Sequence, residues 1–172
     1  YCATGGHDPA HTPTPAAGEA SSTGIATITF DALYVVNGAD NSISVINTET
    51  NEVAGTIALK NAAFPHHVYL RADRSKLALA VPGIDLSGGH GGGHGGGTPT
   101  PGIVMLLDAT TGATLKARKL PTMNHNAAFA PSGEIWTTQM AEAGKVLALD
   151  GTTLEDKGSI DVGASPAEVT FS

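Results

Sequence analysis

Two of the seven histidines occupy the same position in a repeated segment, and they are the residues of this chain best suited to chemistry. Three segments align with one another: Phe64–Leu70, Met123–Phe129 and Ser165–Phe171. The first two carry His66 and His125 at the matching position, whereas the third carries Ala167. Imidazole is the commonest protein ligand for zinc and copper, and a metal site needs several such groups that converge from different segments. We therefore predict that His66 and His125 bind one transition-metal ion or one small ligand.

Three further histidines and a methionine are candidate ligands of the same site. His67 follows His66 directly, but strand residues alternate between faces, so we expect its side chain on the other face. His90 and His94 are separated by three glycines, and they are predicted to close over the site as a lid. Met123 offers a soft sulfur donor, which would favour copper.

These histidines could also have purely structural roles, and this alternative stays open. A histidine at the start of a strand is more often a hydrogen-bonded structural residue. A Gly-His loop is more often an irregular segment that sequesters metal weakly. His7 and His11, near the N-terminus, are the weakest candidates.

Signatures of enzyme chemistry are otherwise missing from the sequence. There is no phosphate loop, no dinucleotide fingerprint and no nucleophile paired with a base. Ser132 and Gly133 fall in a predicted hairpin turn, and Asp73, Asp108 and Asp150 are typical of turns whose carboxylates accept local amide hydrogen bonds. The sequence leaves enzymatic activity undecided and favours a binding module.

The elements that must position the histidines are short strands in a repeated pattern. Leu33–Ile57 holds three apolar runs separated by turn residues. The phrase Ser44–Asn51 returns as Val104–Gly112 and again as Val146–Thr153, and the last two copies lie 42 residues apart. A period of this length with four strand-like runs per copy predicts an all-β fold, a β-propeller of four-stranded antiparallel blades.

About three blades are expected between residues 25 and 172. The predicted strands of the first are Leu33–Val36, Ile43–Ile46 and Val53–Leu59; of the second, Val68–Leu70, Leu77–Val81, Ile103–Leu107 and Thr114–Leu120; of the third, Ala127–Phe129, Ile135–Thr138, Lys145–Leu149 and Gly158–Val162. Ile25–Phe30 is a candidate edge strand, and Glu168–Phe171 is predicted to open a fourth blade. Because three blades do not close a ring, we expect further blades, from the same polypeptide or from other chains.

Two segments are expected to lie outside the blades. Residues 1–24 are rich in Gly, Pro, Ala and Thr and predict a flexible linker. Pro82–Gly102 is a Gly/His-rich insertion between two strands of the second blade, which explains the longer spacing of 61 residues between Asn47 and Asp108.

The wording of Leu33–Ile57 resembles the YVTN family of β-propeller repeats, and the resemblance extends over about Leu33 to Ser172. Such repeats occur in bacterial periplasmic and surface proteins and in archaeal surface layers. They are similar in fold to the propellers of cytochrome-type nitrite reductase, which holds haem, and of nitrous-oxide reductase, which holds copper. The resemblance thus implies an extracytoplasmic protein, with the propeller centre as the place for a ligand. This chain lacks a Cys-x-x-Cys-His haem attachment motif, so haem is less favoured than copper or zinc.

Composition narrows the classes of partner. The net charge of −7 argues against nucleic acid, and no apolar run approaches the ~20 residues of a membrane helix. Cys2 is the single cysteine, so an internal disulfide is excluded. Cys2 followed by a polar, Pro-rich stretch resembles the start of a bacterial lipoprotein, which suggests a lipid anchor, although Tyr1 should not precede such a cysteine.

Two functions follow from these observations. The first is an extracytoplasmic propeller that acts as a binding or scaffold module and binds a transition metal through histidines on one face. The alternative is a redox enzyme or electron-transfer domain that holds copper or haem at the propeller centre.

Overall fold

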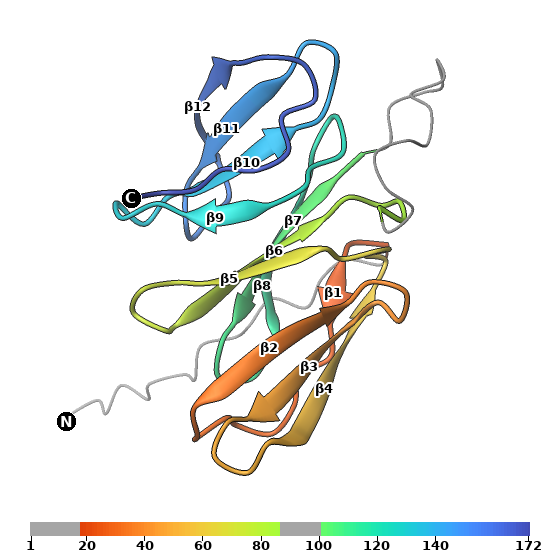
Figure 1. The fold of residues 1–172 in the computed structure, drawn as a ribbon, viewed down its shortest axis with the longest axis vertical. Coiled ribbons are helices and arrows are strands. Elements are labelled where there is room, and N and C mark those ends of the chain that lie inside the picture. The colour runs from red at the N-terminus through yellow and green to blue at the C-terminus, as the bar shows by residue number, and fades with distance from the viewer. Residues whose placement is uncertain (1–17, 87–100) are drawn as a thin grey trace, which may run out of the picture.

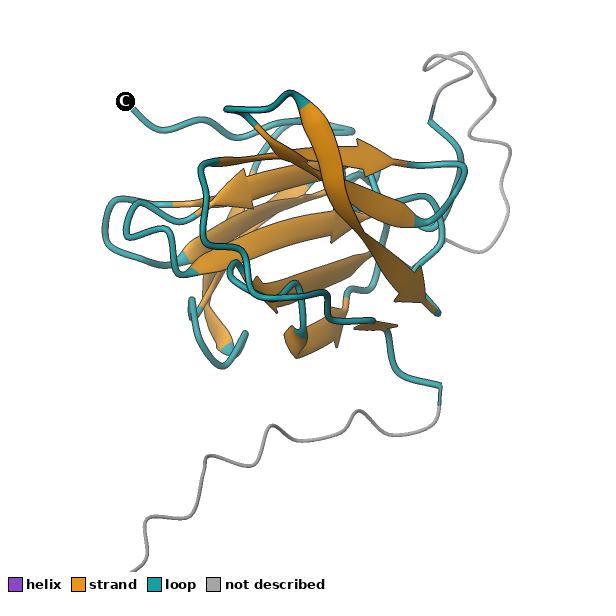
Figure 2. Ribbon diagram, turned by 90° about the horizontal axis from the view of Figure 1, so that it is seen from below, coloured by secondary structure: helices purple, strands orange, loops and turns teal. Residues whose placement is uncertain are grey.

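The computed structural model describes residues 18–86 and 101–172, which fold into three four-stranded antiparallel sheets and contain no helix (Figures 1 and 2). Accordingly, no helix in these ranges is long and apolar enough to cross a membrane. The strands are β1 (Ser21–Ser22), β2 (Ala32–Asn37), β3 (Ser42–Asn47), β4 (Glu52–Lys60), β5 (His67–Leu70), β6 (Lys76–Val81), β7 (Ile103–Asp108), β8 (Thr114–Lys119), β9 (Ala127–Phe129), β10 (Ile135–Gln139), β11 (Lys145–Leu149) and β12 (Asp156–Asp161).

The second and third sheets are complete propeller-like blades, with strand orders β5-β6-β7-β8 and β9-β10-β11-β12. Consecutive strands pair as neighbours because each apolar run is followed by a short turn. After β3, β7 and β11, the side chains of Asn47, Asp108 and Asp150 each accept backbone amide hydrogen bonds two and three residues on. A β-bulge precedes each of these turns. The predicted all-β fold of four-stranded blades is confirmed.

The first sheet is assembled differently, in the order β1-β4-β3-β2. Turn and bulge positions make β2, β3 and β4 equivalent to the last three strands of the other blades. Its fourth strand is β1, which pairs with the outer side of β4, and in the described chain no innermost strand lies beside β2. The segment Ile25–Phe30, predicted as an edge strand, is not a strand; the amides of Ile25 and Ile28 instead donate to Thr111 and Thr110 in the turn after β7.

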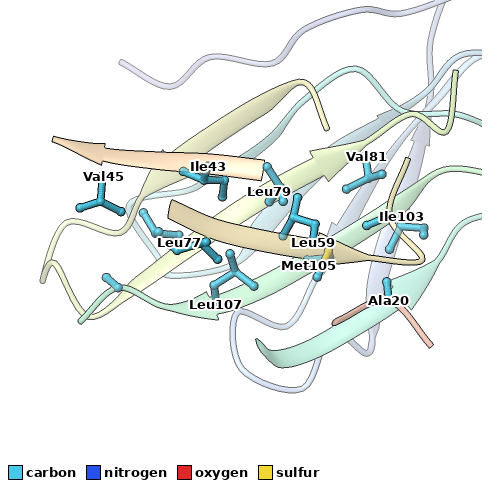
Figure 3. Packing of buried hydrophobic residues seen from close by; sticks show 13 residues of the cluster. Ala20, Ile43, Val45, Leu59, Leu77, Leu79, Val81, Ile103, Met105 and Leu107 are labelled. Atoms are coloured by element: carbon cyan, nitrogen blue, oxygen red, sulfur yellow. The ribbon is translucent and has the colours of Figure 1, made fainter. Parts of the chain in front are cut away.

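Two apolar layers hold the three sheets together. The layer between the first and second sheets includes Ile43, Val45, Leu79 and Met105, all fully buried (Figure 3). A second layer lies between the second and third sheets. Its buried residues are Ala78, Ala80, Val104, Leu106, Leu120, Ala127, Ile135, Leu147, Leu149 and Leu154. The two central strands of the middle sheet, β6 and β7, are thus buried on both faces, which explains their continuous apolar runs.

The outward faces of the two end sheets remain apolar and exposed. On the first sheet Leu33 and Val53 both pair with Ile46, so the three side chains share one face, and Leu33 and Val53 are 52% and 62% exposed. On the third sheet and the segment after it, Ile160 and Phe171 are also exposed.

The structure describes only parts of the two segments that were predicted to lie outside the blades. Ser21 and Ser22, placed in the linker, form β1, and Ala20 is buried in the core; residues 1–17 lie outside the described residues. On either side of the predicted insertion, β6 ends at Val81 and β7 begins at Ile103. Residues 87–100, with His90 and His94, lie outside the described residues.

The predicted fourth-blade strand is not observed. Glu168–Phe171 has no strand pairing and lies beside the start of the third blade, where Asn126 holds it by hydrogen bonds to Val169. A strand forms when its backbone groups bond to a neighbouring strand. Here the backbone N–H and carbonyl of Val169 bond instead to the buried side-chain amide of Asn126.

Candidate metal centre

The histidine site is built where two neighbouring innermost strands, β5 and β9, begin (Figure 1). His66 directly precedes β5, and its backbone amide donates to Ala80 of β6 at 2.9 Å. His125 precedes β9, and its amide donates to the hydroxyl of Thr138 at 3.4 Å. Because both are anchored to the second strand of their own blade, the repeated backbone brings equivalent residues of adjacent blades together.

Three imidazole rings lie in mutual contact at this point. The ring centroids of His66 and His125 are 4.4 Å apart, those of His66 and His67 are 4.4 Å apart, and those of His67 and His125 are 4.8 Å apart. One nitrogen from each ring lies within 4.8 Å of the other two. The Nδ1 atoms of His66 and His67 are 3.2 Å apart, and Nδ1 of His67 is 3.2 Å from the carbonyl oxygen of His125. This arrangement offers three nitrogen donors to one ion.

The cluster is partly shielded from water. The side chain of His125 is 11% exposed and that of His67 is 31% exposed. The nitrogens are thus held close together before any ligand binds, which reduces the cost of ordering them around one ion.

A carboxylate completes the group. Glu168 Oε1 lies 3.6 Å from His67 Nε2 and 4.0 Å from His125 Nδ1. Sequence reasoning did not select Glu168, although the signal was present: in the aligned segments Glu168 occupies the position of His67 and Asn126.

The structure brings together His66, His67 and His125, and it corrects the expectation that His67 faces away. His66 precedes the strand, so the alternation of strand residues does not govern the pair, and both rings turn to the same side. Met123 is half-buried two residues before His125, and its role as a soft ligand stays a prediction. His7, His11, His90 and His94 lie outside the described residues, although Val81 and Ile103, which flank the insertion, lie at the same end of the sheet as His67.

A separate cleft of about 380 Å³ opens near Leu70, at the other end of β5. Three of its polar side chains are already engaged: Arg74 forms a 2.6 Å ion pair with Asp31, and the Tyr34 hydroxyl donates to the carbonyl of Ala109 at 2.6 Å. Burial raises the pKa of Tyr34 above its ordinary value, and the nearby Arg74 opposes that rise. These closed contacts make the cleft a weaker candidate than the histidine cluster.

Comparison with known proteins supports the fold. No protein-family model and no curated protein matches the sequence. Among solved structures, hydrazine synthase of Kuenenia stuttgartiensis aligns with a TM-score of 0.60 and 15% identity over 78% of this chain. The dihydro-heme d1 dehydrogenase NirN in complex with DHE aligns with a TM-score of 0.55 and 13% identity over 92% of this chain. Both are propeller-type structures, and the chain spans about a third of the length of each, 34%.

Proposed function

We propose that this protein is an extracytoplasmic β-propeller module that binds one transition-metal ion through His66, His67 and His125. The observation that carries the proposal is the convergence of three imidazole nitrogens, from two adjacent blades, to within 4.8 Å of one another. A lone structural histidine needs no such partners, and repetition of the fold alone does not require a histidine at this position.

The spacing suits a tetrahedral ion. With Zn–N distances of roughly 2.0–2.1 Å, two ligand nitrogens of a tetrahedral site lie about 3.3–3.4 Å apart. Nδ1 of His67 lies 3.2 Å from Nδ1 of His66 and 3.2 Å from the carbonyl oxygen of His125, so it can donate to that carbonyl and leave Nε2 as the ligand nitrogen of His67. The three ligand nitrogens lie within 4.8 Å of one another, so none has to approach another by more than about 1.5 Å to reach the tetrahedral spacing.

The extracytoplasmic location and the membership in YVTN-type repeats form part of the proposal. The support is the sequence of the repeats and the low content of charged residues, 15%. Anchoring through Cys2 and capping of the site by His90 and His94 extend the same proposal.

We propose that further blades cover the exposed apolar faces of the first and third sheets. Leu33 and Val53 on the first sheet, and Ile160 on the third, are more exposed than residues of a finished core. β2 also lacks an innermost neighbour among the described strands, so it offers an edge to another strand. The additional blades belong either to the same polypeptide or to another chain.

The alternative function is a redox or electron-transfer domain with copper or haem at this face. The similarity in fold to NirN, a dihydro-heme d1 dehydrogenase solved in complex with DHE, is the reason to test for it. However, the ring centroids of His66 and His125 are 4.4 Å apart, and that leaves no space for a macrocycle between the two rings. A haem here would have to be held by a single imidazole from one side.

Calorimetric titration of the purified chain with Zn²⁺ and with Cu²⁺ tests the proposal. We expect tight one-to-one binding that is abolished in the His66→Ala/His125→Ala double variant, while the thermal melting of the apo protein is retained. Equal affinity in the wild type and the double variant would overturn the metal site. An absorption spectrum of the protein as isolated decides the alternative, because a haem or copper band in the visible would establish the redox cofactor.

A further inference from the structure

We propose that Glu168 is the fourth ligand of the metal ion, so that the site has three imidazoles and one carboxylate and prefers zinc. This inference rests on the proposed metal site. A single oxygen, Oε1, already approaches two of the three rings, at 3.6 Å from His67 and 4.0 Å from His125. The first of these separations exceeds the ~3.3–3.4 Å ligand-to-ligand edge of a tetrahedral zinc site by about 0.2–0.3 Å, and the second exceeds it by about 0.6–0.7 Å.

The backbone on both sides of Glu168 is fixed to the blade that carries His125. On one side, the hydroxyl of Thr138 donates to the carbonyl of Ala167 at 3.2 Å. On the other side, the buried amide of Asn126 donates to the carbonyl of Val169 at 3.0 Å and accepts from its amide at 3.3 Å. The carboxylate therefore reaches the rings from a segment whose position is set by three hydrogen bonds.

Repetition gives an independent reason for the placement. The three aligned segments put His67, Asn126 and Glu168 at one position, and they put His66, His125 and Ala167 at the preceding one. Two ligands come from the second blade, one from the third, and the segment after β12 supplies a carboxylate where it lacks a histidine. The donor set thus draws on each of the three repeats.

This donor set decides which metal fits best. Carboxylate oxygen suits borderline and hard divalent ions, whereas cuprous copper selects soft sulfur ligands. Four donors satisfy the tetrahedral coordination of a closed zinc site. One carboxylate also reduces the net charge of the occupied site from two to one. Zinc is therefore preferred over the cuprous ion that Met123 would favour, and a tetrahedral arrangement of the four donors selects Zn²⁺ over Cu²⁺, whose usual geometry is tetragonal.

The experiment compares Zn²⁺ affinities by competition with a chromophoric chelator in the wild type, Glu168→Gln and a matched control, Glu142→Gln. Glu142 is exposed on the loop after β10, and its replacement removes the same charge without touching the rings. We expect Glu168→Gln to weaken Zn²⁺ binding by at least about 10–100-fold, because losses of that size follow the removal of groups that only hydrogen-bond to a metal ligand. Glu142→Gln should stay within about twofold of the wild type.

The visible absorption spectrum of bound Co²⁺ reports directly on the coordination of the metal ion. Co²⁺ in the wild-type site should show the intense visible bands of a four-coordinate ion, and Glu168→Gln should change their position and intensity. If Glu168→Gln matches Glu142→Gln in Zn²⁺ affinity and leaves the Co²⁺ spectrum unaltered, Glu168 is not a ligand, although the histidine site stands. If the His66→Ala/His125→Ala variant keeps the wild-type affinity, the histidine site itself is wrong.

Discussion

Replacing Asn126 with Ala should release the segment that carries Glu168. Asn126 is fully buried, and its side chain makes two hydrogen bonds with the backbone of Val169, at 3.0 and 3.3 Å. At about 0.5–1.5 kcal/mol each, their loss is worth about 2 kcal/mol. That is an increase of about thirtyfold in the local opening of this segment. Native-state hydrogen exchange at the Val169 amide measures it.

Asn124→Ala is the matched control for this prediction. Asn124 is equally buried, but its side chain donates to Ile103 and Thr137, neither of which belongs to the segment that carries Glu168. We expect Asn124→Ala to lower global stability while it leaves the exchange of Val169, relative to the core, unchanged. Wild-type exchange at Val169 in the Asn126→Ala variant would refute the reasoning that side-chain hydrogen bonds place Glu168.

Three further perturbations test the turns and the open faces. Gly112→Ala should cost about 2–4 kcal/mol in urea denaturation, because φ is +70° there and a Cβ would overlap buried Ile57; a loss under ~0.5 kcal/mol would contradict this packing. The backbone amide of Thr153, with smaller contributions from other local donors, holds the pKa of Asp150 below its ordinary value of 3.8. The ionised Asp150 carboxylate therefore stabilises the fold above pH 3.8, and this stabilisation is lost as the pH falls through the lowered pKa. Asp150→Asn should keep the turn and make the free energy of unfolding less dependent on pH in the acid range. An NMR titration of wild-type Asp150 that gives a pKa at or above 3.8 would disprove this explanation. Leu33→Lys should leave the monomer fold intact but reduce self-association in light scattering, and an unchanged mass distribution would show that this face does not associate.

The strand pattern follows from the sequence alone because its causes are local. The sequence predicts a strand over Leu77–Val81 and the structure has one over Lys76–Val81, since an apolar run between turn residues has few other ways to bury itself. The turns after Asn47 and Asp108 are equally local, because each side chain bonds amides two and three residues on. The alignment of His66 with His125 follows from the same repetition.

Only the tertiary structure decided which groups meet at the site. His67 joins the cluster because His66 lies outside the strand, so the alternation of strand residues does not separate them. Glu168 reaches His67 from a distant part of the sequence, through the packing of the third blade on the second and the hydrogen bonds of Asn126. The pairing of β1 with β4 is of the same kind, because a two-residue strand has no periodicity to detect and forms where an unpaired edge is available.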